Sequence, residues 1–225
     1  MEEFVMYQYD YQTLLDKIIF PGLRDTLIML GGTVVTCTLF GFILALILIT
    51  TDAKGLRPNR AVYETFSAII NVLRSVPFII LIITIIPLTR FVVGTTIGTT
   101  AAIFSITIVG SPLLARLLEG CFKEVNPSLI EAARSFGASD WQITFNVIVS
   151  EAIPSIISNL TIGFISLLGF TAMAGTVGAG GLGAVALSYG YQNFNDTIMY
   201  TTVVILIVIV QFIQLGGNML YRKLK

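Results

Sequence analysis

Five apolar runs, each long enough to cross a lipid bilayer as a helix, constrain this chain more than any other feature. They cover approximately Thr26–Thr50, Thr65–Thr89, Ile97–Leu118, Ile153–Met173 and Thr197–Gly217. A helix needs about 20 apolar residues to span the hydrocarbon core. The runs also lack the alternation of apolar and polar residues that marks barrel strands. We therefore expect an all-α, polytopic membrane protein with five transmembrane helices in one domain, residues 1–225.

The amino-acid composition excludes several other classes of protein. The chain is 55% hydrophobic and 12% charged, and its formal net charge is zero, so no excess of positive charge points to nucleic acid. It has no histidine, and its two cysteines, Cys37 and Cys121, lie in different runs. Without histidine to activate a nucleophile, and with so few metal ligands, we expect no catalytic residue, no metal site and no cofactor in this chain.

The distribution of lysine and arginine predicts how the chain crosses the membrane. Nine of the 13 basic residues fall on one side of the five runs, three fall on the other, and Arg74 lies within a run. The side with more basic residues is normally cytoplasmic. We expect the N-terminus outside and the C-terminus in the cytoplasm. Residues 128–150 would then be cytoplasmic, and the glycine-rich loop, residues 174–196, would lie outside.

Polar residues recur along one face of the second run. They are Arg60, Glu64, Ser67, Asn71 and Arg74, each three or four residues after the one before. Ionisable groups at membrane depth normally face a bundle interior or water, so this face could line a passage or a subunit contact. The alternative is a helix lying on the cytoplasmic surface, with the true span starting near Ser75. Pro77 is expected to bend the helix in either case.

Two further patterns lie in and after the fourth run. Ser155, Ser158, Asn159 and Ser166 have the small polar side chains that allow close helix packing, and a subset of them could line a wet path. Gly178, Gly180, Gly181 and Gly183 lie within a G-x-G-x-x-G spacing that also occurs in dinucleotide sites. Because no strand precedes these glycines, we expect them to let a re-entrant or tightly packed loop approach the bundle.

A polar helix–glycine–helix stretch separates the third and fourth runs. Glu131 and two alanines open it, Gly137 follows six residues after the glutamate, and Pro154 lies at the start of the next run. Ser128 is expected to cap a first helix that Gly137 ends, and Asp140 to start a second. The composition alone fits an ordinary loop helix, whereas the spacing favours a docking element.

This spacing resembles the EAA motif of ABC importer permeases. Glu131-Ala132-Ala133 and Gly137 match the motif, while Val149-Ser150 stands where a Leu-Pro pair is typical. From about Thr26 onward the chain resembles the methionine importer branch, in Arg74–Phe78, in the glycine run and in Tyr189-Gly190-Tyr191. Glycine-rich loops of this kind also occur in betaine and phosphonate permeases.

The resemblance implies a type I ABC importer permease fold and a set of partners. Two copies would form the translocation pathway within membrane lipid. Two cytoplasmic ATPase subunits, which carry ATP and magnesium, would receive residues 128–150, called the coupling segment from here on. An extracytoplasmic binding protein would deliver the solute. The expected coupling contacts are Glu131, Ala132, Ala133, Phe136, Gly137 and Trp141. The expected pathway residues are Arg74, Asn71, Ser166 and Met173, with Met173 as an outer-gate residue.

The function that follows is import rather than catalysis. The sequence contains no G-x-x-x-x-G-K-[ST] phosphate loop, so ATP hydrolysis would occur in another chain. We expect the permease subunit of an ATP-driven methionine importer in a prokaryotic inner membrane. One alternative is another small solute: another amino acid, betaine or a phosphonate. A stand-alone secondary carrier is the third reading, and the lack of paired carboxylates within the runs argues against proton coupling.

Overall fold

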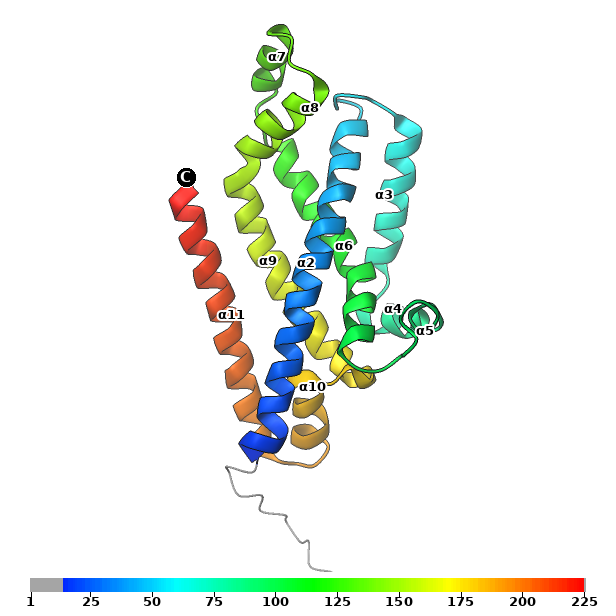
Figure 1. Ribbon diagram of the computed structural model, residues 1–225, viewed down its shortest axis with the longest axis vertical. Helices are drawn as coiled ribbons and strands as arrows, with labels where there is room; N and C mark the ends of the chain where they lie inside the picture. Colours follow the sequence, from blue (N-terminus) through cyan, green and yellow to red (C-terminus); the bar gives the residue numbers. More distant parts are fainter. Residues whose placement is uncertain (1–13, 225) are drawn as a thin grey trace, which may run out of the picture.

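The computed structural model describes residues 14–224, and over that range the chain forms helices joined by loops (Figure 1). The four longest helices are α2 (Phe20–Thr51), α6 (Thr99–Lys123), α9 (Ser150–Ala174) and α11 (Asp196–Leu224). Helix α2 packs along α6, α6 packs on α9, and α11 packs on α9. The N-terminal residues 1–13, which we expect on the extracytoplasmic side, lie beyond the described residues.

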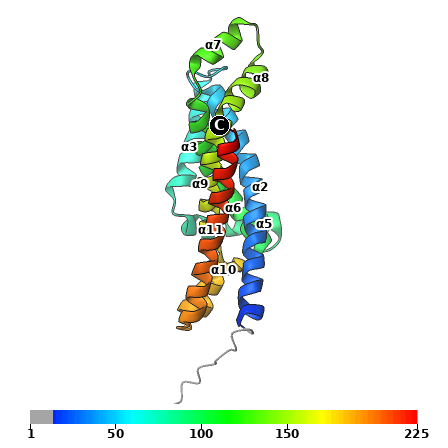
Figure 2. The same cartoon turned by 90° about the vertical axis from the view of Figure 1, so that its left-hand side faces the viewer.

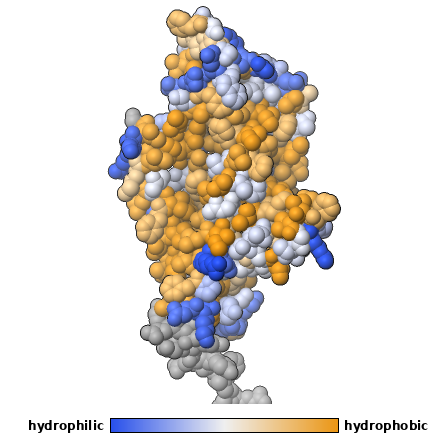
Figure 3. All heavy atoms as spheres, viewed as in Figure 1, coloured by the Kyte–Doolittle hydropathy of each residue, from blue (hydrophilic) through white to orange (hydrophobic). Residues whose placement is uncertain are grey.

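The main core lies where α2, α6 and α9 meet. Met29 and Cys37 of α2, Leu114 of α6 and Leu167 of α9 are completely buried there. Along α11, in contrast, only Ile198 and Thr202 are buried, and the other apolar side chains are partly or fully exposed. The space-filling view shows a broad apolar band between two more polar ends (Figure 3). An apolar exterior of this kind is what a helical membrane protein presents to lipid.

Four of the five predicted spans are confirmed as long apolar helices. The corresponding continuous stretches are Leu15–Thr51, Thr99–Lys123, Asp140–Ala179 and Asp196–Leu224. The second predicted span, Thr65–Thr89, is wrong as a single helix. It is divided among α3 (Arg60–Ser75), α4 (Phe78–Thr84) and α5 (Ile86–Val93), and α3 meets α4 at 106°.

The break in the second span lies at Pro77, where a bend was expected. Proline disfavours helical geometry in the residue before it, and Val76 is accordingly extended, with a ψ angle of 130°. The ring nitrogen also cannot donate to the preceding turn. Pro112 and Pro154, however, lie inside α6 and α9 without ending them. As a result, α4 and α5 turn away from the line of α3, and α5 is seen nearly end-on (Figure 1).

The coupling segment and the C-terminal end of α11 lie at the same end of the bundle. The helices of the segment are α7 (Pro127–Ser135) and α8 (Asp140–Gln142), and both views show them at this end (Figures 1 and 2). The opposite end carries the start of α2 and the short helix α10 (Gly181–Ala184). The two regions that the positive-inside rule assigns to opposite faces therefore lie at opposite ends.

The glycine-rich loop is largely helical rather than irregular. A kinked turn, Gly175–Ala179, in which Val177 and Gly178 are not helical, leads into α10, and a π-helical stretch, Val185–Tyr191, follows. Gly181 has a φ angle of 82°, and a Cβ atom on Gly183 would lie 2.0 Å from the Ala172 carbonyl oxygen. The backbone N–H of Leu182 donates to Thr26 Oγ1 on α2, at 2.8 Å. The predicted close approach to the bundle is confirmed.

Candidate functional site

Helix α7 of the coupling segment begins at a cap that differs from the expected one. The Asn126 side chain accepts a hydrogen bond from the backbone N–H of Ser128 at 3.0 Å, and Pro127 occupies the first helical turn. Ser128 as the cap is therefore wrong, since an asparagine two residues earlier satisfies the free backbone donor. Gly137 follows the helix with a φ angle of 78°, as expected for a residue that ends a helix.

The second part of the segment is a continuous helix leading into the membrane. Ser139 and Gln142 form a capping box, and α8 begins at Asp140 as predicted. A π-helical stretch, Ile143–Val149 (η2), then joins α8 directly to α9. A force applied to α8 would therefore reach α9 without a flexible joint.

The coupling segment exposes aromatic side chains at its tip. Phe136 is 91% exposed and Trp141 is 72% exposed. Trp141 also packs on Phe145, with 4.2 Å between the ring centroids. Large apolar side chains that gather on a polar surface mark interaction sites. Both aromatic residues are exposed on the coupling segment, as docking requires, and their contact with a partner stays a prediction.

The remaining coupling residues differ in their surroundings. Glu131 and Ala132 are exposed on α7. Ala133 is only half-buried, but it packs against a core cluster that includes Ile143 of this chain. Of the two alanines, Ala132 is therefore the one available to a partner, whereas Ala133 helps to seat α7 on the bundle.

The four candidate pathway residues lie on two different helices. Asn71 and Arg74 lie on α3, which packs on α2 and α6, and Ser166 and Met173 lie on α9, which packs on α6. Arg74 is exposed in the last turn of α3. The Ser166 hydroxyl donates to the Ile162 carbonyl, and Met173 is about half exposed at the end of α9.

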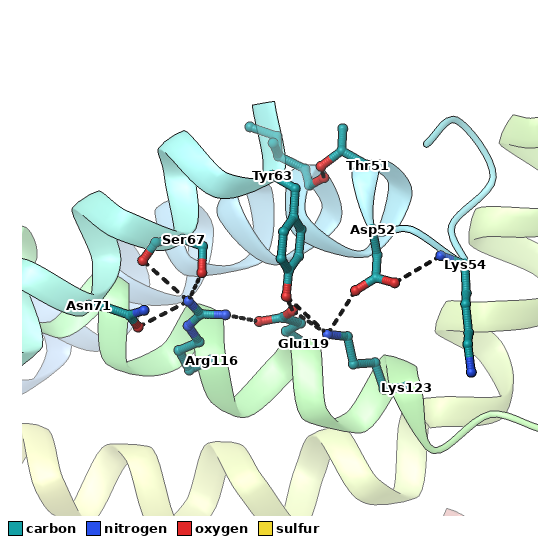
Figure 4. Close-up of polar contacts among 10 residues, drawn as sticks. Thr51, Asp52, Lys54, Tyr63, Ser67, Asn71, Arg116, Glu119 and Lys123 are labelled. Atoms are coloured by element: carbon teal, nitrogen blue, oxygen red, sulfur yellow. Dashed lines mark hydrogen bonds and ion pairs between the residues drawn. The ribbon is translucent and has the colours of Figure 1, made fainter. Parts of the chain in front are cut away.

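The polar face of α3 has an explanation that neither sequence interpretation contained. Ser67 and Asn71 both accept hydrogen bonds from the guanidinium group of Arg116 on α6, the latter at 3.0 Å (Figure 4). Arg60 and Arg74, at the two ends of this face, are exposed. The middle of the polar face is thus a helix contact inside this chain.

Arg116 belongs to an ionic cluster that the sequence reasoning missed. Arg116 Nη1 donates to Glu119 Oε2 at 2.7 Å, and Glu119 Oε1 lies 2.8 Å from Lys123 Nζ. The Tyr63 hydroxyl of α3 donates to the same carboxylate at 3.2 Å. Lys123 also contacts Asp52, at the end of α2, at 3.0 Å (Figure 4). The cluster, called the ionic network below, joins three helices.

The charges of the ionic network are balanced. Arg116 and Lys123 face Glu119 and Asp52, so two positive groups meet two negative groups. Glu119 is only 3% exposed, and burying a carboxylate is costly unless it is paired and hydrogen-bonded. Arg116, Glu119 and Lys123 lie three and four residues apart on α6. That spacing, facing the polar residues of α3, was the signal that could have revealed the network.

Asp52 is the member of the network that lies at the end of α2. The backbone N–H of Lys54 donates to its carboxylate at 3.0 Å, and this bond, together with Lys123, holds the pKa of Asp52 below its usual value. Burial opposes this effect, because desolvation disfavours the charged form. Asp52 therefore stays ionised at neutral pH.

Comparison with known proteins gives a consistent family. Residues 37–225 match the family model described as binding-protein-dependent transport system inner membrane component. A Vibrio cholerae protein named probable D-methionine transport system permease protein MetI is 48% identical over 183 residues, 81% of each chain. The Bacillus subtilis methionine import system permease protein MetP is 40% identical over 174 residues, which cover 77% of this chain and 78% of the relative.

The fold matches solved structures as well. A structure described as an inward facing conformation of the MetNI methionine ABC transporter superposes with a TM-score of 0.92 and 37% identity. The match covers 96% of this chain and all of that chain. A structure of an amino acid ABC transporter matches with a TM-score of 0.77 and 21% identity, which shows the shared fold alone. The chain therefore belongs to the family of binding-protein-dependent transport system inner membrane components.

Proposed function

We propose that this chain is the permease subunit of an ATP-driven methionine importer in a prokaryotic inner membrane. The similarity to permeases named for methionine in Vibrio cholerae and Bacillus subtilis supports the substrate. The observation that carries the mechanism is the exposed aromatic tip of the coupling segment, beside the Glu131-Ala132-Ala133 motif. By the same similarity, two copies of the chain form the pathway and bind two ATPase subunits.

The ATPase subunits would hold ATP and magnesium, because the sequence has no phosphate loop of its own. Closure of the ATPase subunits on ATP would move the two coupling segments. The segment is placed to pass this movement on: α7 follows α6 after only three residues, and α8 continues into α9 through η2. Helices α6 and α9 belong to the core, so their displacement would change the packing along the pathway.

The orientation in the membrane is part of the proposal. The coupling segment and C-terminus would lie in the cytoplasm, where most of the basic residues fall. The glycine-rich loop at the other end would then face the extracytoplasmic binding protein that delivers the solute. In that position, Met173 and the tightly packed glycines would shape the outer gate.

Reconstitution tests this function directly. The chain, purified with the ATPase subunit from the same organism, is placed in proteoliposomes, and uptake of labelled methionine is measured with and without ATP and the binding protein. We expect uptake only with the ATPase and ATP. Methionine flux through the chain alone would overturn the proposal in favour of a secondary carrier. ATP-driven uptake of betaine or a phosphonate, with none of methionine, would keep the mechanism and reject the substrate.

A further inference from the structure

We infer that Asp140 and Glu119 are positioning residues that make α3 follow the coupling segment when the ATPase moves it. The inference rests on the proposed function, and it concerns how the movement of the coupling segment reaches α3, a helix outside the segment. Helix α3 is separated in sequence from the coupling segment. An ion pair joins the loop before α3 to the segment, and hydrogen bonds join α3 to α6.

The first contact ties the coupling segment to the loop before α3. Arg57 lies three residues before α3, and its Nε atom donates to Asp140, the first residue of α8, at 2.6 Å. Both side chains reach water, so the pair alone is weak. Its effect depends on whether the loop can transmit the displacement.

The loop is folded tightly enough to transmit it. The backbone N–H of Arg57 donates to the Thr50 carbonyl at 2.9 Å, and that of Asn59 donates to the Thr51 carbonyl at 3.0 Å. A Cβ atom on Gly55 would lie 2.5 Å from backbone carbonyl oxygens. The loop therefore lies back against the end of α2, with little room to stretch between Asp140 and α3.

The second contact ties α3 to α6, the helix that leads into the coupling segment. Glu119 accepts from Tyr63 of α3 and is held by Arg116, whose guanidinium also donates to Ser67 and Asn71 (Figure 4). The ionic partners of Glu119 lie on α6 itself. Separating α3 from α6 would therefore break the hydrogen bonds that Tyr63, Ser67 and Asn71 make to charged groups, and such bonds are stronger than those between neutral groups. Because Glu119 is buried, we expect this contact to persist while α6 moves.

Together the two contacts enclose α3 between the coupling segment and α6. Any displacement of the segment is then applied to the loop just before α3 and to the middle of α3. Helix α3 ends at the 106° break before α4, so its displacement also moves the start of α4. A route of this kind requires measured coupling, because proximity alone does not show it.

Charge reversal across the exposed pair tests the first contact with little risk to folding. Arg57→Asp and Asp140→Arg are made singly and together, and methionine uptake per ATP hydrolysed is measured in the reconstituted complex. We expect each single reversal to lower this ratio about threefold, and the double reversal to restore it. Arg60→Asp, a reversal at an exposed residue three positions after Arg57 for which no ion pair is described, is the matched control. Equal ratios in the single variants and in wild type would show that the Arg57–Asp140 pair does not transmit the movement.

Spin labels on the two copies test whether α3 moves with the segment. Ser135→Cys labels the coupling segment and Ala68→Cys labels α3, both at exposed positions. In wild type we expect ATP to change the distance between the two copies at both positions. In Glu119→Gln combined with Arg57→Asp, the Ser135 distance should still change, while the change at Ala68 should be lost. The single variant Glu151→Gln, on an exposed carboxylate of α9, controls for loss of charge.

An Ala68 distance that changes as in wild type, in the combined variant, would overturn the inference. A variant that merely misfolds is recognised because its Ser135 distance would no longer respond either, and the pair of charge reversals then decides the outcome. Failure of the proposed function has a different signature, since wild type itself would then show no ATP-driven uptake.

Discussion

The coupling segment and the ionic network lie at the same end of the molecule but are built in opposite ways. The segment is held by local devices, the Asn126 cap and the Ser139 capping box, and it leaves Phe136 and Trp141 exposed. The network combines ion pairs within α6 with hydrogen bonds to residues about 50 positions away in sequence, and its central carboxylate, Glu119, is buried. The aromatic side chains of the segment are free to contact a partner, whereas the charged side chains of the network are paired with one another within the chain.

This difference separates what a partner needs from what the fold needs. Exposed aromatic side chains contribute little to the stability of an isolated chain, so changing them should affect assembly and transport. Buried ionic contacts contribute to the stability of the chain itself, because removing one member leaves its partners without compensation. Substitutions in the two regions should therefore give opposite patterns of stability and transport.

The largest loss is expected from Glu119→Ala. It leaves Arg116 and Lys123 without their shared carboxylate, and we expect the free energy of unfolding to fall by about 3 kcal/mol, the lower end of the range for buried pairs since Lys123 partly reaches water. Thermal unfolding of the purified permease measures this. Glu151→Ala, on an exposed carboxylate, should unfold near the wild-type temperature. Similar unfolding temperatures for both variants would show that the network does not stabilise the fold.

In the coupling segment we expect transport to be lost while the stability of the fold is retained. Glu131→Lys and Gly137→Asp should each abolish ATP-driven uptake while the protein stays in the membrane. Gly137 has a left-handed backbone that aspartate tolerates at a cost of about 1 kcal/mol, so unfolding should change little. Uptake assays and thermal unfolding on the same preparations separate the two effects. Wild-type uptake in both variants would refute the docking role of this segment.

A smaller effect distinguishes the observed cap from the expected one. Asn126→Ala removes the side chain that accepts from the Ser128 backbone and should weaken α7 by about 1 kcal/mol. Ser128→Ala should have almost no effect, because Ser128 contributes its backbone N–H to this bond and not its hydroxyl. Hydrogen exchange of the α7 amides compares the two variants. Faster exchange in Ser128→Ala than in Asn126→Ala would contradict the assignment.

The smallest effect concerns pH. The Lys54 backbone N–H and Lys123 hold the pKa of Asp52 below its unfolded value. This carboxylate therefore stabilises the fold above its unfolded pKa, and the contribution is lost as the pH falls through the lower, folded pKa. Thermal unfolding between neutral pH and about pH 3 should show this loss in wild type and a smaller one in Asp52→Asn. Identical pH dependence in the two proteins would count against the contact.

Much of the fold could be predicted because bilayer length is a strong constraint. Apolar length alone identified α2, α6, α9 and α11, and residue spacing alone located the coupling segment. The broken second span could not be predicted in full, since Pro77 ends a helix while Pro112 and Pro154 do not. Whether a proline ends a helix depends on the packing around it, and single-chain patterns do not contain that information.

The ionic network shows the same limit for the candidate site. The polar residues on α3 were recognised as a face, but their partner, Arg116, lies on another helix. Pairing two faces requires knowing that α3 packs against α6, which follows from tertiary structure. The aromatic tip was easier to predict, because Phe136 and Trp141 belong to a polar stretch between two spans and need no partner within the chain to be recognised.

Trp141 provides the most direct test that the exposed segment docks on a partner, because it is the only tryptophan in the chain. The permease can be made with 5-fluorotryptophan and mixed, in lipid nanodiscs, with unlabelled ATPase subunit. We expect its single ¹⁹F resonance to shift, and its response to a soluble paramagnetic relaxation agent to fall, when the complex forms. An unchanged resonance that stays fully accessible in a complex proven by co-elution would contradict docking through the coupling segment.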